Sequence, residues 1–197
     1  MGLNFKTLIF LSFILKDMIV TGYFGWGPCP SIPKNAEQYV SLKDKNFHYS
    51  FEDFNAGQYL GTWYDVLRTS DFPWAKGNCT QALYYIREDG RVGVLNSEII
   101  NGKNHSIIGE VFADTNIPGQ LYAKFFRFAP LGDYKVIRTD YEKSSLVFSC
   151  ISLWVFHWKY AWILARNVNT EVPSYHPIIE ALGIPMSAML KTSHDNC

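Results

Sequence analysis

The chain has 197 residues and a mass of 22.6 kDa, which suits one domain with a substantial core. Its 18 Lys and Arg residues balance its 18 Asp and Glu residues, so no excess positive charge is available to attract a nucleic acid. Phe, Tyr and Trp make up 16% of the residues, and this composition favours an all-β fold because strands are rich in aromatic side chains.

The first 22 residues have the features of a secretory signal peptide. Lys6 precedes an apolar stretch over 8–15, and small residues follow up to Gly22. The stretch is too short to span a bilayer and is interrupted by Lys16 and Asp17. We therefore predict cleavage near Gly22 and a secreted, extracellular protein; the alternative is a disordered apolar tail.

The cysteines agree with an oxidising destination. They are even in number, widely spaced and free of CxxC metal pairs, so two long-range disulfides are the simplest interpretation. These residues are Cys29, Cys79, Cys150 and Cys197. Two N-x-S/T tripeptides, which start at Asn78 and Asn104, are candidate glycosylation sites in an exported chain.

Residues 28–50 are rich in Pro, Lys and Asn without periodicity, which predicts an extended arm. From residue 61 onward, short apolar runs alternate with turn signals such as Asp89-Gly90 and Asn101-Gly102, a pattern typical of antiparallel strands. Eight such strands can close into an up-and-down barrel. We predict them at 61–69, 79–88, 91–100, 106–115, 119–128, 132–141, 144–153 and 160–167.

Two later segments are distinguished by their apolar patterns. Residues 173–183 have apolar side chains at helical spacing and end in Gly183, which predicts a short helix packed outside the sheet. Residues 146–164 are apolar enough to suggest a membrane span, but His157 and Lys159 lie within them. We interpret this stretch as a hairpin.

Three segments resemble the three signature regions of the lipocalin family. They are FNAGQYLGTWY at 54–64, TDY at 139–141, and Arg166 at the end of the last predicted strand. FSC at 148–150, AWILARN at 161–167 and the terminal cysteine are similar to lipocalins of the apolipoprotein D and insect bilin-binding type. The resemblance implies one lipocalin domain over 23–197: an arm (23–58), an eight-stranded antiparallel up-and-down β-barrel (59–168), and a C-terminal α-helix packed outside with its tail (169–197).

The resemblance also assigns structural roles. In lipocalins the tryptophan of the GxW motif closes the narrow end of the barrel and the late arginine lies across its ring, as Trp63 and Arg166 would do here through a cation–π contact. Gly61 would let the preceding turn pass close to this floor. The implied structural residues are Gly61, Trp63, Thr139, Asp140, Tyr141 and Arg166. The implied disulfides are Cys29–Cys150 and Cys79–Cys197.

Side-chain alternation, counted from Trp63 and Arg166, predicts the inner face of the barrel. Small residues at Ala82, Gly109 and Ala123 predict room for a ligand, and Asn96 is the expected polar group that orients it. The alternative is that these side chains are simply a filled core. The predicted ligand-binding residues are Trp162, Tyr84, Asn96, Phe125, Tyr134, Ala82, Val94 and Leu121.

These observations favour a secreted carrier of a small hydrophobic ligand, such as a lipid, sterol, retinoid or tetrapyrrole, without a cofactor or metal. A lipocalin-fold enzyme acting on a lipid is an alternative, but every cysteine has an expected partner and the histidines are scattered; Asp65 is the candidate buried acid or base. A protein-binding lipocalin is a third class. Phe72, Pro73 and Trp74 lie in the first long loop at the expected open end, where they could cover the entrance or contact a membrane or receptor.

Overall fold

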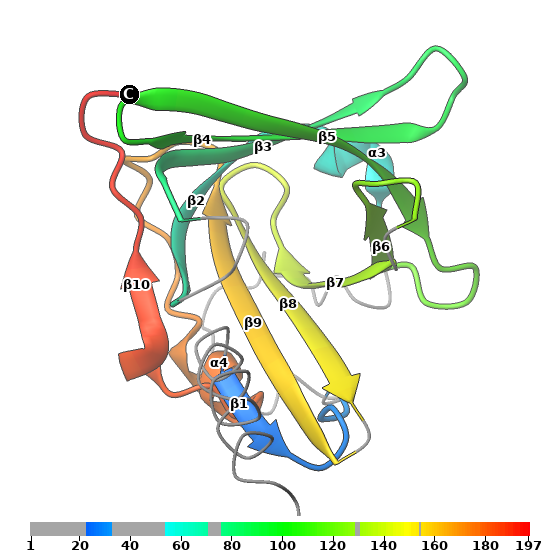
Figure 1. The fold of residues 1–197 in the computed structure, drawn as a ribbon, viewed down its shortest axis with the longest axis vertical. Coiled ribbons are helices and arrows are strands. Elements are labelled where there is room, and N and C mark those ends of the chain that lie inside the picture. The colour runs from blue at the N-terminus through cyan, green and yellow to red at the C-terminus, as the bar shows by residue number, and fades with distance from the viewer. Residues whose placement is uncertain (1–22, 33–53, 71–75, 129–130, 154) are drawn as a thin grey trace, which may run out of the picture.

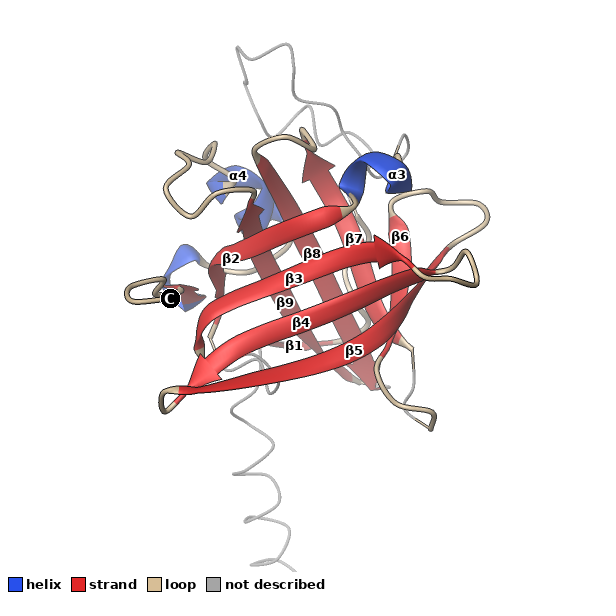
Figure 2. Ribbon diagram, turned by 90° about the horizontal axis from the view of Figure 1, so that it is seen from above, coloured by secondary structure: helices blue, strands red, loops and turns tan. Residues whose placement is uncertain are grey.

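The computed structural model describes residues 23–32, 54–70, 76–128, 131–153 and 155–197. Within these residues, ten strands form one antiparallel sheet in the order β1-β9-β8-β7-β6-β5-β4-β3-β2-β10 (Figure 1). An additional pairing of β9 with β2 closes strands β2 to β9 into a barrel. In Figure 2, strands β2 to β5 cross in front of β7 to β9, forming two walls of this barrel. The predicted eight-stranded barrel is therefore confirmed.

The barrel strands lie close to their predicted positions. β9 begins before residue 160 and β6 ends before residue 128, because pairing of β8 with β9 extends to Leu153 and Phe156, whereas pairing of β6 with β7 stops at Ala123. The stretch over 146–164 is a hairpin, as predicted. The strands are β2 (Gly61–Thr69), β3 (Asn78–Ile86), β4 (Val92–Ile100), β5 (Lys103–Ala113), β6 (Gln120–Lys124), β7 (Gly132–Thr139), β8 (Ser144–Leu153) and β9 (Phe156–Ala165).

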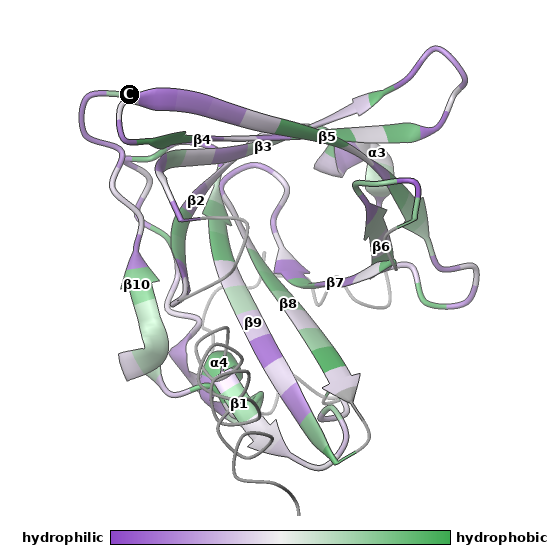
Figure 3. Ribbon diagram, in the orientation of Figure 1, coloured by the Kyte–Doolittle hydropathy of each residue, from purple (hydrophilic) through white to green (hydrophobic). Residues whose placement is uncertain are grey.

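Turn chemistry sets the tight connections. Asn101 and Gly102 both have positive φ, at 51° and 73°, which is the requirement of a two-residue type I′ hairpin between β4 and β5. Gly90 has φ 80° in the turn between β3 and β4, where the Arg87 N–H donates to the Arg91 carbonyl at 2.8 Å. Along β9, hydrophilic bands interrupt hydrophobic ones, as expected of a strand with two different faces (Figure 3).

Besides the short helix η2 (Met186–Ala188), three short elements have no counterpart in the sequence-based assignment. β1 (Tyr23–Trp26) pairs with the start of β9, α3 (Ala56–Tyr59) precedes β2, and β10 (Met189–Lys191) pairs with the end of β2. The side chain of Asn55 caps α3 by accepting a hydrogen bond from the Gln58 N–H at 3.2 Å. The predicted signal peptide (1–22) and most of the predicted arm lie outside the described residues.

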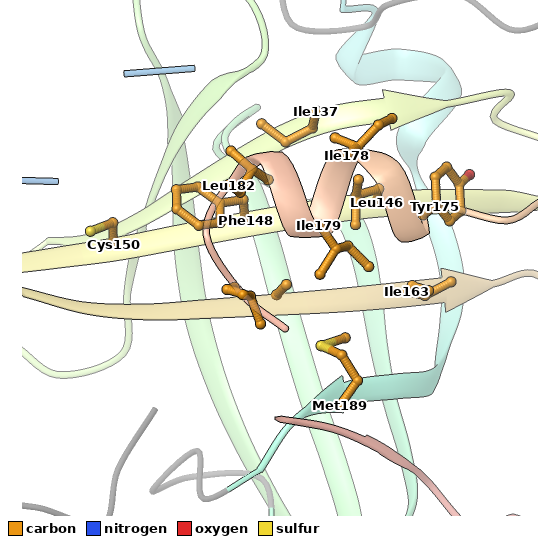
Figure 4. Packing of buried hydrophobic residues seen from close by; sticks show 12 residues of the cluster. Ile137, Leu146, Phe148, Cys150, Ile163, Tyr175, Ile178, Ile179, Leu182 and Met189 are labelled. Atoms are coloured by element: carbon orange, nitrogen blue, oxygen red, sulfur yellow. The ribbon is translucent and has the colours of Figure 1, made fainter. Parts of the chain in front are cut away.

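The predicted C-terminal helix is α4 (His176–Ala181), followed by the short helix η2 (Met186–Ala188). α4 packs its apolar side chains on the outer faces of β7, β8 and β9 (Figure 4). Gly183 ends it with φ 74°, and the Ile184 N–H donates to the Ile179 carbonyl at 3.1 Å. The buried cluster comprises Ile137, Leu146, Phe148, Cys150, Ala161, Ile163, Tyr175, Ile178, Ile179, Leu182, Ile184 and Met189. Within the described part of the chain, no helix has the length and apolar character needed to cross a bilayer.

Both disulfides implied by the family resemblance are present. Cys29 is bonded to Cys150 in β8, and Cys79 in β3 is bonded to Cys197 at the end of the chain. All four cysteines of the sequence are thus paired.

Candidate functional site

Strand register identifies the side chains that share the inner face of the barrel. Residues directly opposite in an antiparallel pair lie on the same face, and Trp63 is opposite Ala82, which is opposite Asn96. Seven of the eight predicted lining residues belong to the inner apolar cluster around Trp63, and Asn96 shares their face through Ala82. The seven are Trp162, Tyr84, Phe125, Tyr134, Ala82, Val94 and Leu121. Their placement agrees with the sequence analysis, and their contact with a ligand stays a prediction.

Trp63 forms the floor at one end of this inner face. Its side chain is fully buried, the ring of Tyr59 stacks on it at 4.9 Å, and its Nε1–H donates to the Tyr59 carbonyl at 2.9 Å. The guanidinium carbon of Arg166 lies 3.8 Å from the ring centroid, as the cation–π assignment requires. Gly61 has φ 95°, and a Cβ at this position would lie 3.2 Å from an Arg166 nitrogen, so a larger residue would be strained there.

The TDY segment builds the turn between β7 and β8 that holds Arg166 in place. The Thr139 hydroxyl donates to the Ser144 carbonyl at 3.0 Å and accepts from the Tyr141 N–H at 2.9 Å. One Asp140 carboxylate oxygen accepts from the N–H groups of Lys143 and Ser144 at 2.7 and 2.8 Å. The Tyr141 carbonyl then accepts from Arg166 Nε at 2.9 Å. These residues therefore support the floor.

A cluster of hydroxyl groups lies next to Trp63. The Tyr84 hydroxyl donates to that of Tyr134 at 2.8 Å, and the Tyr59 hydroxyl is 3.3 Å from Tyr134 and 3.1 Å from Ser145. Burial raises the pKa of Tyr59 to about 12 and also raises the pKa values of Tyr84 and Tyr134, so all three stay neutral. Sequence analysis did not single out Tyr59, which precedes the first predicted strand, or Ser145, although alternation along the predicted strand 144–153 turns Ser145 inward. The hydroxyls of Tyr84 and Tyr134 hydrogen-bond to each other instead of being directed toward a ligand.

The inner face is less tightly packed than the outer cluster under α4. Ala82, Val92, Val111, Phe125, Tyr134 and Trp162 are only partly buried, whereas most side chains beneath α4 are 3% exposed or less. The strand register directs these side chains inward, so their exposed surface faces the barrel interior. This difference supports a hollow rather than a filled core.

The small residues contribute to this hollow unequally. A Cβ on Gly109 would lie 2.7 Å from the ring of Phe125, so this ring takes the space that we expected Gly109 to leave open. A gap of about 40 Å³ lies between α3 and part of the inner face, and its volume is well below the roughly 300 to 1,000 Å³ of ordinary ligand pockets. Its lining residues are Phe54, Ala56, Tyr59, Leu60, Tyr84, Val92, Val111, Ala113 and Leu121.

Asp65 points inward and belongs to a polar group in the barrel wall. Its carboxylate Oδ2 accepts from Arg68 Nη1 at 2.8 Å, and Arg68 also donates to the Thr192 hydroxyl at 2.9 Å and to the Gly77 carbonyl at 3.0 Å. The side chain of Arg68 lies where β2 stops pairing with β3 and begins to pair with β10. Burial raises the pKa of Asp65, and the neighbouring Arg68 opposes that rise. Asp65 is therefore an ion-paired residue.

An aromatic column follows the inner face of β9. Phe156, Trp158, Tyr160 and Trp162 alternate with outward residues, and Tyr160 stacks on Trp162 at a centroid distance of 6.1 Å. Phe24 from β1 extends the column by contacting Phe156 and Trp158 at 5.9 and 6.2 Å. Only Trp162 was singled out from the sequence, although the same period-two pattern identifies the others.

The remaining predicted site residues lie on the surface or outside the described chain. Asn78 and Asn104 are exposed, and their glycosylation stays a prediction. Phe72, Pro73 and Trp74 lie outside the described residues. Within the described ranges, no group of three or more His, Cys, Asp or Glu side chains is placed to hold a metal ion.

Comparison with known proteins agrees with this geometry. A family model described as a lipocalin-like domain matches residues 54–192. Apolipoprotein D of Bos taurus is 38% identical over 153 residues, which cover 74% of this chain and 80% of that protein. Apolipoprotein D of Cavia porcellus is 35% identical over 181 residues, covering 88% and 86%.

Among solved structures, insecticyanin from the tobacco hornworm Manduca sexta has a TM-score of 0.69 at 18% identity, covering 89% of this chain and 90% of its own. Lobster apocrustacyanin A1 has a TM-score of 0.65 at 17% identity, covering 87% and 91%. These structures share the fold. Together with the barrel, its Trp63–Arg166 floor and the match over 54–192, they lead to one conclusion: the chain belongs to the lipocalin family.

Proposed function

We propose that this protein is a secreted carrier that binds a small hydrophobic ligand inside its barrel, for transport or sequestration. The observation that supports this proposal best is the inner face itself, which is apolar and aromatic but only partly buried at Ala82, Phe125, Tyr134 and Trp162. Burying this partly exposed apolar surface under a lipophile is favourable in free energy. The paired cysteines agree with an oxidising, extracellular location.

The Trp162→Ala substitution is expected to weaken binding of a fluorescent lipophile by about tenfold, because it removes a large aromatic wall from the inner face. Equilibrium fluorescence titration measures the change. Ile108→Ala is the matched control, since Ile108 is 60% exposed on the outer face of β5 and should leave affinity unchanged. Equal affinities in the wild type and the Trp162 variant would contradict the assigned site.

The carrier proposal is separable from its two alternatives. The protein is purified from a secreting host without detergent, and its organic extract is examined by mass spectrometry. A stoichiometric, chemically unchanged hydrophobe supports a carrier. Conversion of an added lipid would instead support an enzyme, and an extract without any hydrophobe would favour a protein-binding role.

We further infer that the open end of the barrel contacts a lipid surface. Strands β6 and β8 end there and β7 and β9 begin there, and this end has many exposed apolar side chains; Phe128 is 92% exposed and Trp26 is 77% exposed. The others are Phe24, Phe126, Leu131, Ile151 and Val155. Grouped apolar residues of this kind mark an interaction surface.

The combined substitution Trp26→Ser and Phe128→Ser is expected to reduce co-sedimentation with phosphatidylcholine vesicles at least severalfold, by removing two exposed rings. Ile117→Ser is the matched control, because Ile117 is 40% exposed in the loop between β5 and β6 at the opposite end of the barrel. If the wild type does not sediment with vesicles, or if Ile117→Ser has the same effect as the double variant, the open end is not a lipid-binding surface.

A further inference from the structure

A groove lies on the outside of the barrel, between the sheet and the C-terminal segment 192–197. The Cys79–Cys197 disulfide and a hydrogen bond from the Cys79 N–H to the Ser193 carbonyl at 2.8 Å hold this segment against β3. The groove has a volume of about 270 Å³, close to the roughly 300 Å³ at which ordinary ligand pockets begin. We call it the outer groove; its lining residues are Tyr64, Cys79, Gln81, Ser97, Glu98, Ile99, Asn104, His194 and Cys197.

Polar side chains form one row across the base of the outer groove. Tyr64 lies opposite Gln81, and Gln81 lies opposite Ser97. These residues alternate with inward residues such as Trp63, so their side chains are on the outer face of the sheet. The side chains of Gln81 and Ser97 make no hydrogen bond within the described part of the chain. The base of the groove therefore offers free donors and acceptors to a polar ligand.

Asn104 is an exposed residue of this lining. It starts one of the two N-x-S/T tripeptides, and its side-chain amide makes no hydrogen bond within the described ranges, so its nitrogen is available for attachment of a glycan. In the strand register, Ile99 lies between Asn104 and Asn78, which starts the other tripeptide. Asn78 is not among the lining residues. A glycan on Asn104 would therefore start at the outer groove, whereas one on Asn78 would start outside it.

The remaining lining favours a neutral sugar over an anionic ligand. Glu98 contributes a carboxylate that accepts from the Gly77 N–H at 2.6 Å, and none of the described lining residues is Lys or Arg, so an anion would be repelled. His194 Nε2 donates to the Asp65 carbonyl at 2.7 Å, which leaves Nδ1 of the neutral ring as an acceptor. The ring of Tyr64, in edge contact with His194 at 5.9 Å, adds an apolar surface. N-acetylglucosamine has matching chemistry, with hydroxyl and acetamide groups around an apolar ring face.

We propose that the outer groove binds the first N-acetylglucosamine residues of a glycan attached to Asn104. This inference rests on the secretion proposed above, because such glycans are added to exported chains. Covalent attachment makes the binding intramolecular, so weak contacts are sufficient to keep the sugars in the groove. Contacts with both the sheet and His194 would also stabilise the C-terminal segment.

The first test measures how easily the linkage to Asn104 is reached. Full-length protein secreted from a eukaryotic host is treated in its folded state with peptide N-glycosidase F, and mass spectrometry of its peptides follows release at each site. Ser97→Trp fills the groove, so we expect release at Asn104 to be about tenfold faster than in the wild type. Ile108→Trp is the matched control, since Ile108 is 60% exposed on the outer face of β5 away from the groove, and should leave the rate unchanged. Equal rates in the wild type and Ser97→Trp would overturn the proposal.

The second test measures the stability of the C-terminal segment. Trypsin cleaves after Lys191, which is exposed and directly precedes this segment. We expect the Asn104→Gln variant to be cleaved there about fivefold faster than the wild type, because loss of the glycan removes its contacts with the segment. Asn78→Gln removes the other candidate glycan and should be cleaved at the wild-type rate. No acceleration in Asn104→Gln, or the same acceleration in both variants, would contradict a specific role of the groove.

Failure of this proposal and failure of the proposed function are distinguishable. If the protein is secreted without a glycan on Asn104, the groove proposal fails while the secreted carrier stands. If the chain is neither exported nor glycosylated, both fail. If Ser97→Trp does not fold, Gln81→Trp fills the same groove, and faster release at Asn104 in that variant supports the proposal, whereas an unchanged rate overturns it.

Discussion

Replacing Trp63 with alanine is expected to lower the free energy of unfolding by about 3 to 5 kcal/mol. The indole is fully buried between the stacked ring of Tyr59 and the guanidinium of Arg166. Its loss would leave a cavity at the floor and remove the hydrogen bond from Nε1 to the Tyr59 carbonyl. Urea denaturation followed by circular dichroism measures the effect.

The control for this change is Trp162→Ala, which also removes an indole, but from the partly buried inner face of β9. That variant should lose affinity for a lipophile but little stability. If both substitutions reduced stability equally and neither changed the affinity, the division between a structural floor and a ligand-binding wall would be wrong.

Removing the Cys29–Cys150 disulfide by changing both residues to serine is expected to cost about 4 to 5 kcal/mol in the chain-entropy model. The bond joins residues 121 positions apart, so its loss frees a large loop in the unfolded chain. The Cys79–Cys197 bond closes a loop of similar length, 118 positions, and its double serine variant should lose a similar amount. Thermal and urea denaturation under oxidising conditions measure both losses.

Reduced wild-type protein is the control for the serine side chains themselves. Serine at position 150 lies in the apolar cluster under α4, and an additional loss there would reflect burial of a hydroxyl. If either double variant were as stable as the wild type, the bond that it removes would not stabilise the fold through the unfolded chain.

The barrel and its inner face could be predicted because their signals are local. Alternation along each strand fixed the faces of residues such as Val94, Leu121 and Trp162, and the TDY and GxW segments identified the floor. α4 could be predicted equally well, because its apolar spacing ends at a glycine with positive φ. β1, α3 and β10 were not, because three or four residues are too few to show a period.

The ion pair between Asp65 and Arg68 could not be predicted, for a different reason. Strict alternation from Trp63 would turn Leu67 inward and Arg68 outward, but the register of β2 against β9 shifts between Asp65 and Leu67. This irregularity reverses the faces beyond it, so that Arg68 lies opposite the inward Trp162 and reaches Asp65. Nor could spacing reveal that the ring of Phe125 covers Gly109, since that contact joins two strands.

The closed sheet has two overhanging strands, because β1 and β10 occupy the ends of the strand order. Each is followed shortly by a cysteine bonded into another strand, Cys29 to β8 and Cys197 to β3. While these bonds are intact, neither β1 nor β10 can separate from its neighbouring strand and begin a loss of pairing that spreads along the sheet. In a reducing compartment both would be free to fray and to pair with neighbouring molecules, so the oxidised state also protects the protein against edge-to-edge aggregation.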